Sequence, residues 1–124
     1  MGLLERLFGR REVVFNGKNN GFILPPNTIV EVVHPDDLNH LIGSNRPGAV
    51  KAERVQQLFD GDPINTFRVN GSPTAINLRI SKTTRIILGG NSGDGCVKAR
   101  LEEYKAEGYT NVIIDPNITY YEGD

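Results

Sequence analysis

Apolar and polar positions in the second half of the chain follow the pattern of a strand, a turn and a helix. Residues 85–88 form a short, mainly apolar and β-branched run, which predicts a strand. Residues 89–95 contain four glycines, which predicts a turn. Val97, Leu101 and Tyr104 then recur at positions i, i+4 and i+7, so the following helix is expected to bury one stripe of side chains.

The end of this helix and the strand after it are also predicted by the pattern. Gly108 is expected to end the helix, because glycine readily adopts the left-handed conformation that often follows a last helical turn. Residues 112–114 predict the next strand. Pro116 is expected to stop that strand, because proline has no backbone N–H to donate.

The first half of the chain predicts one clear strand and two helices. β-branched side chains fill residues 28–33, and polar Glu31 interrupts this run once, so a strand is expected. Residues 34–42 begin with His-Pro-Asp-Asp and precede a glycine, which predicts a short helix. Residues 49–59 have apolar side chains at helical spacing, which predicts a longer one.

Two further pairs of strands are predicted by alternation and by turn residues. Residues 67–69 and 76–80 alternate apolar and polar side chains around a Gly- and Pro-containing turn, which predicts a hairpin. Residues 13–15 and 22–24 are expected to form a second ribbon, because Asn-Gly turn signals separate them. Residues 1–11 place leucines and a phenylalanine on one face, which predicts a short amphipathic helix that docks on the domain, on a second subunit or on a membrane surface.

These elements predict a single small α+β domain with a mixed β-sheet and two main helices, at residues 49–59 and 94–107. A chain of 124 residues can bury one core, so two domains are not expected. Residues 1–26 are interpreted as an N-terminal helix and β-ribbon extension, and residues 27–119 as the core of the domain.

Composition and charge restrict the class of partner. The chain is 38% apolar and 23% charged, as in ordinary globular proteins, and its net charge of −1 argues against a large surface that binds genomic DNA. Residues 63–100 nevertheless carry six Lys or Arg and one Asp, which suits a small anionic ligand. No membrane span and no signal peptide are expected, so the protein is predicted to be cytoplasmic.

Few residues offer redox, metal or nucleophile chemistry. Cys96 is the only cysteine, so an intramolecular disulfide is excluded; we expect it to be a small buried hydrophobe, and the alternative is a reactive thiol. His34 and His40 are the only histidines, and without a third ligand at suitable spacing they are assigned surface or capping roles. No metal site is therefore predicted.

The glycine-rich turn at residues 89–95 is the strongest candidate for a binding site. Backbone N–H groups of a turn before a helix point in one direction, and the helix dipole favours an anion there. The alternatives are a tight connection without a ligand, and for Asp94 a helix N-cap or a metal ligand. The counter-charges, which include Arg79 and Arg85, could equally lie on a solvated face. The predicted ligand-binding residues are Gly89, Gly90, Asn91, Ser92, Gly93, Asp94, Gly95, Lys98 and Arg100.

The same region resembles the ParB/sulfiredoxin-like superfamily, in which a strand ending in a Gly-Gly or Gly-Glu step leads into a phosphate-contacting turn. The residues that carry the resemblance are 86–91, 99–109 and 111–115, with a weaker match at residues 51–59 and 63–69. The resemblance implies that residues 27–119 form a ParB/sulfiredoxin-like core. It also implies a nucleotide as ligand, with or without Mg²⁺.

The chain also departs from that superfamily at the turn itself. Nucleotide-hydrolysing ParB proteins carry arginines directly after the glycine step, and sulfiredoxins carry a catalytic Cys followed by His-Arg, where this chain has Asn-Ser-Gly-Asp at residues 91–94. No catalytic residue is therefore assigned, and enzymatic activity stays open. The predicted function is binding of a phosphate, nucleotide or nucleic acid by the turn. The alternative is a noncatalytic interaction or assembly protein of phage or plasmid type, such as a virion component, acting as a homo-oligomer or with a protein partner.

Overall fold

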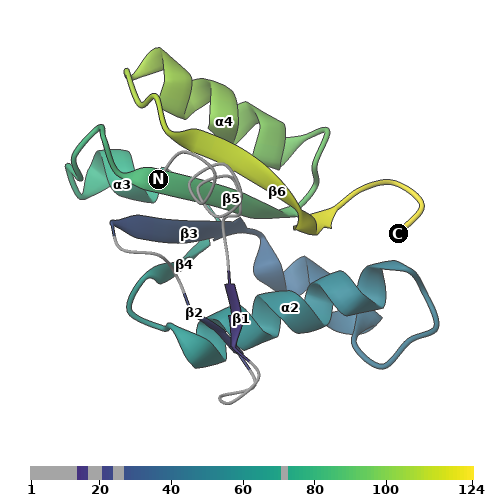
Figure 1. Ribbon diagram of the computed structural model, residues 1–124. Coiled ribbons are helices and arrows are strands. Elements are labelled where there is room, and N and C mark those ends of the chain that lie inside the picture. The colour runs from purple at the N-terminus through teal and green to yellow at the C-terminus, as the bar shows by residue number, and fades with distance from the viewer. Residues whose placement is uncertain (1–13, 17–20, 24–26, 71–72) are drawn as a thin grey trace, which may run out of the picture.

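The larger β-sheet has four strands in the order β4-β3-β5-β6, and every neighbouring pair is parallel (Figure 1). The computed structural model describes residues 14–16, 21–23, 27–70 and 73–124. The strands of this sheet are β3 (Thr28–Val33), β4 (Thr66–Val69), β5 (Arg85–Asn91) and β6 (Val112–Tyr120). Strand β3 is buried along its whole length, as expected for a central parallel strand rich in β-branched residues.

Helices cover both faces of this sheet. Figure 1 shows α2 against one face and α4 against the other. A separate antiparallel sheet, formed by β1 and β2, packs beside α2. The helices are η2 (Pro35–Leu41, a 3-10 helix), α2 (Gly48–Gly61), α3 (Thr74–Asn77) and α4 (Cys96–Ala106), and the small sheet consists of β1 (Val14–Asn16) and β2 (Gly21–Ile23).

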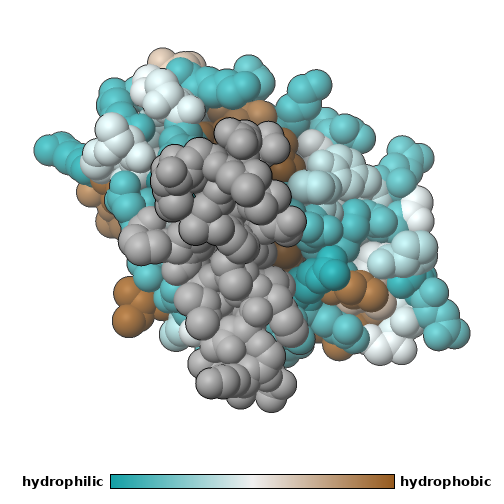
Figure 2. Space-filling view, viewed as in Figure 1, coloured by the Kyte–Doolittle hydropathy of each residue, from teal (hydrophilic) through white to brown (hydrophobic). Residues whose placement is uncertain are grey.

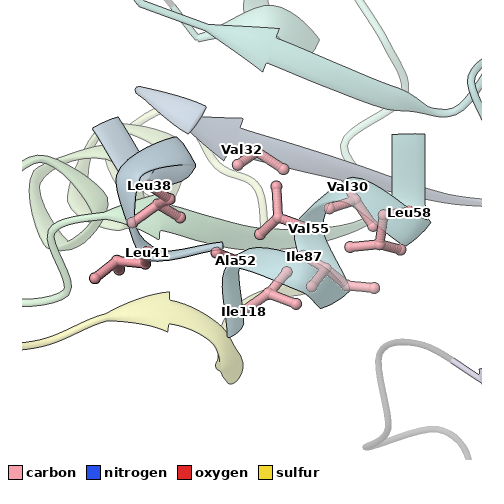
Figure 3. Close-up of a cluster of buried hydrophobic side chains, with 9 residues drawn as sticks. All are labelled: Val30, Val32, Leu38, Leu41, Ala52, Val55, Leu58, Ile87 and Ile118. Carbon is pink, nitrogen blue, oxygen red and sulfur yellow. The ribbon is translucent and has the colours of Figure 1, made fainter. Parts of the chain in front are cut away.

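The alternation of side chains along β3 divides the core into two layers. Val30 and Val32 point toward α2 and η2, and Figure 3 shows them in one apolar cluster with Val55 of α2. Ile29 and Val33 belong to the second cluster, with residues of α3 and α4. Because successive side chains of a strand point to opposite faces, one strand supports both layers.

Most of the predicted elements are confirmed. The α+β class, the strand at residues 28–33 and the helices η2, α2 and α4 are present, and Gly108 follows α4 with a φ of 90°. The antiparallel β1–β2 ribbon is also present, so parallel and antiparallel pairs occur in separate sheets. The helix predicted at residues 1–11 lies outside the described residues.

The strand predicted at residues 76–80 is wrong, because the chain forms helix α3 there. Ile76 and Ile80 are spaced by four as well as alternating, so the pattern fits either element. Packing decides the matter: Ile76 and Ile80 pack against the second core cluster while Leu78 between them is 59% exposed, so these three side chains do not share one face as they would in a strand. The predicted hairpin with residues 67–69 is therefore absent.

Pro116 does not stop the last strand, contrary to the prediction. Strand β6 continues to Tyr120, and the pairing jumps from Leu88↔Ile114 to Gly90↔Thr119. The residues of β6 between Ile114 and Thr119, which include Pro116, form a bulge. The proline therefore does not need a backbone N–H to donate to the neighbouring strand. The strand tolerates it because β6 lies at the edge of the sheet.

The strand order creates a topological switch point between β3 and β5. The chain leaves β3 toward β4 on one side, then returns past β3 to form β5 on the other. The helices that follow β3 and β5 pack on opposite faces of the sheet. In open parallel sheets of this kind, ligands bind outside the carboxyl ends of the strands at such a point. This edge is therefore where the fold favours a site.

Large apolar side chains are exposed at only a few of the described positions. On the face shown in Figure 2, apolar residues form separate patches between hydrophilic ones. The large apolar side chains that are exposed lie on different segments, and single exposed apolar residues are normal for a globular protein. They are Ile42, Val50, Ile64 and Leu78. None of the described helices is long and apolar enough to cross a membrane.

Candidate ligand-binding site at the β5–α4 turn

Strand β5 extends further than the sequence predicts, so the turn comprises only residues 92–95. Gly89 and Gly90 lie inside the sheet, where Gly90 pairs with Val33. A Cβ on Gly90 would lie 2.0 Å from the carbonyl oxygen of Val33, and one on Gly89 would lie 2.6 Å from the Ile118 side chain. Close strand packing therefore explains both glycines without a ligand.

The turn itself is tied to the end of β6. The N–H of Gly93 donates to the carbonyl of Tyr120 at 2.8 Å, and a Cβ at this position would lie 2.1 Å from the Tyr121 ring. The Asn91–Ser92 peptide bond at the start of the turn is cis. Gly93 is thus also a packing residue, which leaves Gly95, with an exposed backbone, as the one exposed glycine of the turn.

Helix α4 begins without a side-chain cap. Gly95 occupies the N-cap position, so the N-cap role predicted for Asp94 is wrong, and the Asp94 side chain is exposed. The carbonyl of Ser92 accepts hydrogen bonds from the N–H groups of Gly95 and Val97, both at 3.1 Å. These backbone bonds close the turn in place of a capping side chain.

Three backbone N–H groups at this helix end stay available. Those of Asp94, Cys96 and Lys98 form no hydrogen bond to any residue within the described part of the chain. The first turn of a helix cannot satisfy its own N–H groups, and the helix dipole adds partial positive charge there. Together these features can hold an anion.

A surface pocket of about 390 Å³ lies beside the turn, and we call it the turn pocket. It is formed by the β5–α4 turn, the loop before α2 and the segment after β6. Arg46 of that loop donates from Nη2 to the hydroxyl of Tyr120 at 3.0 Å. The residues that line the pocket are Arg46, Ser92, Asp94, Tyr120, Glu122 and Gly123.

The segment after β6 is held against α2 by a charged anchor. Lys51 of α2 donates to the carboxylate of Asp124 at 2.7 Å and to the carbonyl of Thr119 at 2.9 Å. Partial burial opposes the effect, but the hydrogen bonds from Lys51 and from the Tyr121 N–H keep the pKa of the Asp124 carboxyl below its usual value. This anchor positions one wall of the turn pocket.

The predicted counter-charges do not gather at the turn. Lys98 is exposed in the first turn of α4. Arg79 is exposed in the segment after α3, and Arg85 is half-buried at the start of β5. Arg100 is only 7% exposed, and its guanidinium donates to Glu31 at 3.3 Å. The structure therefore places Arg100 in a buried ion pair, and the basic residue of the turn pocket is Arg46, which the sequence did not single out.

Glu31 is the centre of a buried polar cluster that the sequence analysis missed. Its carboxylate is fully buried and accepts hydrogen bonds from the Tyr104 hydroxyl and from the N–H of Thr74, the latter at 3.0 Å. Burial raises the pKa of the Glu31 carboxyl, and the hydrogen bond from Tyr104 and the charge of Arg100 oppose this only in part. Burial and the neighbouring carboxylate likewise raise the pKa of Tyr104. The sequence feature that could have indicated this cluster is Glu31 itself, a single carboxylate within an otherwise uncharged β-branched strand.

Side-chain hydrogen bonds connect the carboxyl ends of the strands. Asn91 at the end of β5 donates to Asp37 of η2 at 3.1 Å, so its side chain is already engaged. The Nδ1 atom of His34 lies 3.1 Å from Oδ1 of Asn70, at the ends of β3 and β4. Among the residues that the structure describes, no group of three or more His, Cys, Asp or Glu could hold a metal ion.

Cys96 is exposed at the first residue of α4, so the prediction that it packs in the core is wrong. A thiol reagent should therefore label Cys96 in the native protein about as fast as in urea. Because the side chain is exposed, Cys96→Ala should change the free energy of unfolding by about 0.5 kcal/mol or less. The neighbouring buried residue is the control, since Val97→Ala should cost about 1–3 kcal/mol. Slow labelling in the native state would contradict the exposed position.

Comparison with known proteins adds no relative. No protein-family model, no curated protein and no solved structure matches the chain. The resemblance to the ParB/sulfiredoxin-like superfamily accordingly stays a prediction.

Proposed function

We propose that this chain binds a small phosphate-bearing ligand, a nucleotide or a nucleic-acid phosphate, in the turn pocket. The observation that carries the proposal is the start of α4, where three N–H groups form no hydrogen bond within the described residues, next to a pocket that Asp94 lines together with Arg46. Preorganised N–H groups and an arginine are the usual partners of phosphate oxygens.

The position of the pocket supports the same proposal. It lies at the carboxyl ends of parallel strands, where the turn after β5 meets the end of β6, beside the switch point. Its volume of about 390 Å³ lies within the usual range for ligand pockets, about 300–1,000 Å³. A phosphate at the helix end would also leave space for the group that it is attached to.

One observation favours the second candidate, a noncatalytic interaction or assembly protein. Gly89, Gly90 and Gly93 all have neighbours that a Cβ would strike, so the fold alone requires them. Their presence therefore does not argue for a ligand, and a scaffold with the same fold would need them as well. The two candidates are distinguished by whether any phosphate ligand binds.

Thermal unfolding in the presence of nucleoside mono-, di- and triphosphates and short oligonucleotides, with and without Mg²⁺, tests the proposal. At a free ligand concentration of 100 Kd, binding should stabilise the native state by about 2.7 kcal/mol. Arg46→Gln should weaken the binding about fivefold, roughly 1 kcal/mol, because one charge-assisted hydrogen bond is lost.

The matched control removes the same charge elsewhere. Arg79→Gln alters an exposed arginine near the amino end of β5, and it should leave the affinity unchanged. Substitutions of Gly90 or Gly93 are unsuitable probes, because they would disturb strand packing and the Tyr121 contact whether or not a ligand binds. Absence of any ligand-induced shift would overturn the binding proposal in favour of the scaffold. The cytoplasmic location stays a prediction.

A further inference from the structure

Helix α3 and the residues after it, 73–80, form backbone hydrogen bonds only among themselves. The N–H groups of Asn77, Leu78, Arg79 and Ile80 donate to carbonyls of this same segment, at 2.9–3.1 Å. Within the described residues, no backbone-to-backbone hydrogen bond joins the segment to a neighbouring strand or helix. The segment is therefore not part of the hydrogen-bonded ladder of the sheet.

Side chains of β3 and α4 hold the start of the segment. Glu31 of β3 accepts a hydrogen bond from the N–H of Thr74 at 3.0 Å. The hydroxyl of Tyr104 in α4 accepts one from the N–H of Ala75 at 2.9 Å and donates to the Glu31 carboxylate. These are the first two N–H groups of α3, which a helix cannot satisfy by itself. Two other elements thus supply the hydrogen bonds that the short helix lacks.

The Tyr109 hydroxyl holds the other end of the segment. It donates to the carbonyl of Ile80 at 2.7 Å, and the carbonyl of Ala75 is a second acceptor at 3.3 Å. Tyr109 is buried, and its ring packs edge-on against the ring of Tyr104, with the two centroids 5.2 Å apart. Side chains from outside the segment therefore anchor it at both ends.

The segment buries little surface of its own. Only Pro73 and Ala75 are buried within it, and Ile76 and Ile80 are partly buried against the second cluster. A helix of four residues is also too short to persist in water by itself. Release of the side-chain anchors would therefore unfold the segment, while the strands keep the hydrogen bonds that join them.

We infer that residues 73–80 form a latch that opens and closes as one unit while the sheet stays folded, and that Glu31, Tyr104 and Tyr109 hold this latch closed. In the closed state the latch lies against the fully buried carboxylate of Glu31, which pairs with Arg100. Opening of the latch is the route by which water reaches this buried ion pair. None of these residues lines the turn pocket, so the latch does not depend on the proposed ligand.

Amide hydrogen exchange measured by NMR and corrected for intrinsic rates tests the inference. The N–H groups of Ala75, Leu78 and Ile80 should share one protection factor, at least about 100-fold lower than that of Ile87 in the central strand β5. Low concentrations of urea should speed exchange at Ile87 and leave the latch amides nearly unchanged, because local opening exposes little surface. Latch amides that exchange together with Ile87, with the same urea dependence, would overturn the inference.

Two tyrosine variants test the anchors. Tyr104→Phe and Tyr109→Phe each remove one anchoring hydroxyl and keep the ring in the core, so each should speed exchange of the latch amides about tenfold. The matched control is Thr119→Val, which removes a buried hydroxyl that donates to the carbonyl of Asp115 within β6. This control should leave latch exchange unchanged. Latch exchange that neither tyrosine variant alters, or that Thr119→Val speeds equally, would overturn the assignment of the anchors.

Discussion

Replacing Glu31 with alanine should lower the free energy of unfolding by about 3–5 kcal/mol, the usual cost of removing one member of a buried ion pair. The carboxylate is fully buried, and Arg100 beside it is 7% exposed. Its removal would deprive the buried Arg100 guanidinium of its fully buried carboxylate partner, and would leave the Thr74 N–H without the Glu31 acceptor. Denaturant unfolding at pH 7 gives the measurement.

Two variants test whether the cost arises from the buried cluster. Tyr104→Phe removes only the hydroxyl that donates to Glu31, so it should cost about 1–3 kcal/mol. Glu103 also contacts Arg100, at 3.4 Å, but it is half-exposed, and Glu103→Ala should cost about 1 kcal/mol or less. A loss with Glu103→Ala as large as that with Glu31→Ala would contradict the assignment.

The pH dependence of stability is a further readout of the Glu31 carboxyl group. Its pKa is raised in the folded state, so the native protein binds the proton more tightly than the unfolded chain does. This contribution to stability is complete below the unfolded pKa, near 4.5, and is lost as the pH rises through the folded value. Glu31→Gln should remove this decline. The pKa of Asp115 is also raised by burial, so Asp115→Asn is needed to subtract its share.

Gly90→Ala should destabilise the protein by at least about 3 kcal/mol, because it combines a backbone penalty with a steric one. The φ of Gly90 is 107°, a value that residues with a Cβ rarely adopt, and the new Cβ would lie 2.0 Å from the Val33 carbonyl oxygen. Since β3 and β5 are the central strands, no relaxation at the edge can relieve this contact. Thermal or denaturant unfolding measures the loss.

The control for this substitution is a glycine with the same backbone restriction but open space. Gly43 has a φ of 81°, and a Cβ there would have no atom within 4 Å. Gly43→Ala should therefore cost only about 1–2 kcal/mol, the penalty of a left-handed conformation. Similar losses at both positions would show that the contact with Val33 is relieved, contrary to the prediction.

The elements that the sequence predicted correctly are those with one dominant local pattern. Residues 28–33 have β-branched side chains throughout, and α4 has an apolar stripe that Gly108 ends, so each pattern excludes other elements. Residues 76–80 fit both helical and strand spacing, and there the prediction failed. The strand after Gly108 was placed correctly, but its continuation past Pro116 depends on its position at the sheet edge.

The candidate site was predicted only in part, because its residues come from distant parts of the chain. The turn before α4 could be located from its glycines, but the packing role of Gly93 depends on Tyr121, and that of Gly90 on Val33. Arg46 and Tyr120 are 74 positions apart in sequence, and no local pattern brings them together. The same holds for Arg100, because its position in the predicted helix does not indicate that Glu31 of β3 lies next to it.

The sequence by itself determined the α+β class, the central strand β3, the helices η2, α2 and α4 and the place of the turn, because these depend on neighbours along the chain. The tertiary structure alone decided the strand order, the burial of Glu31 with Arg100, and the joining of Arg46 to the turn in one pocket. Glu31 and Arg100 are 69 positions apart, and only the packing of α4 on β3 brings them into contact. Desolvation and pairing of charges are properties of that packed arrangement, so neither can be read from residue order.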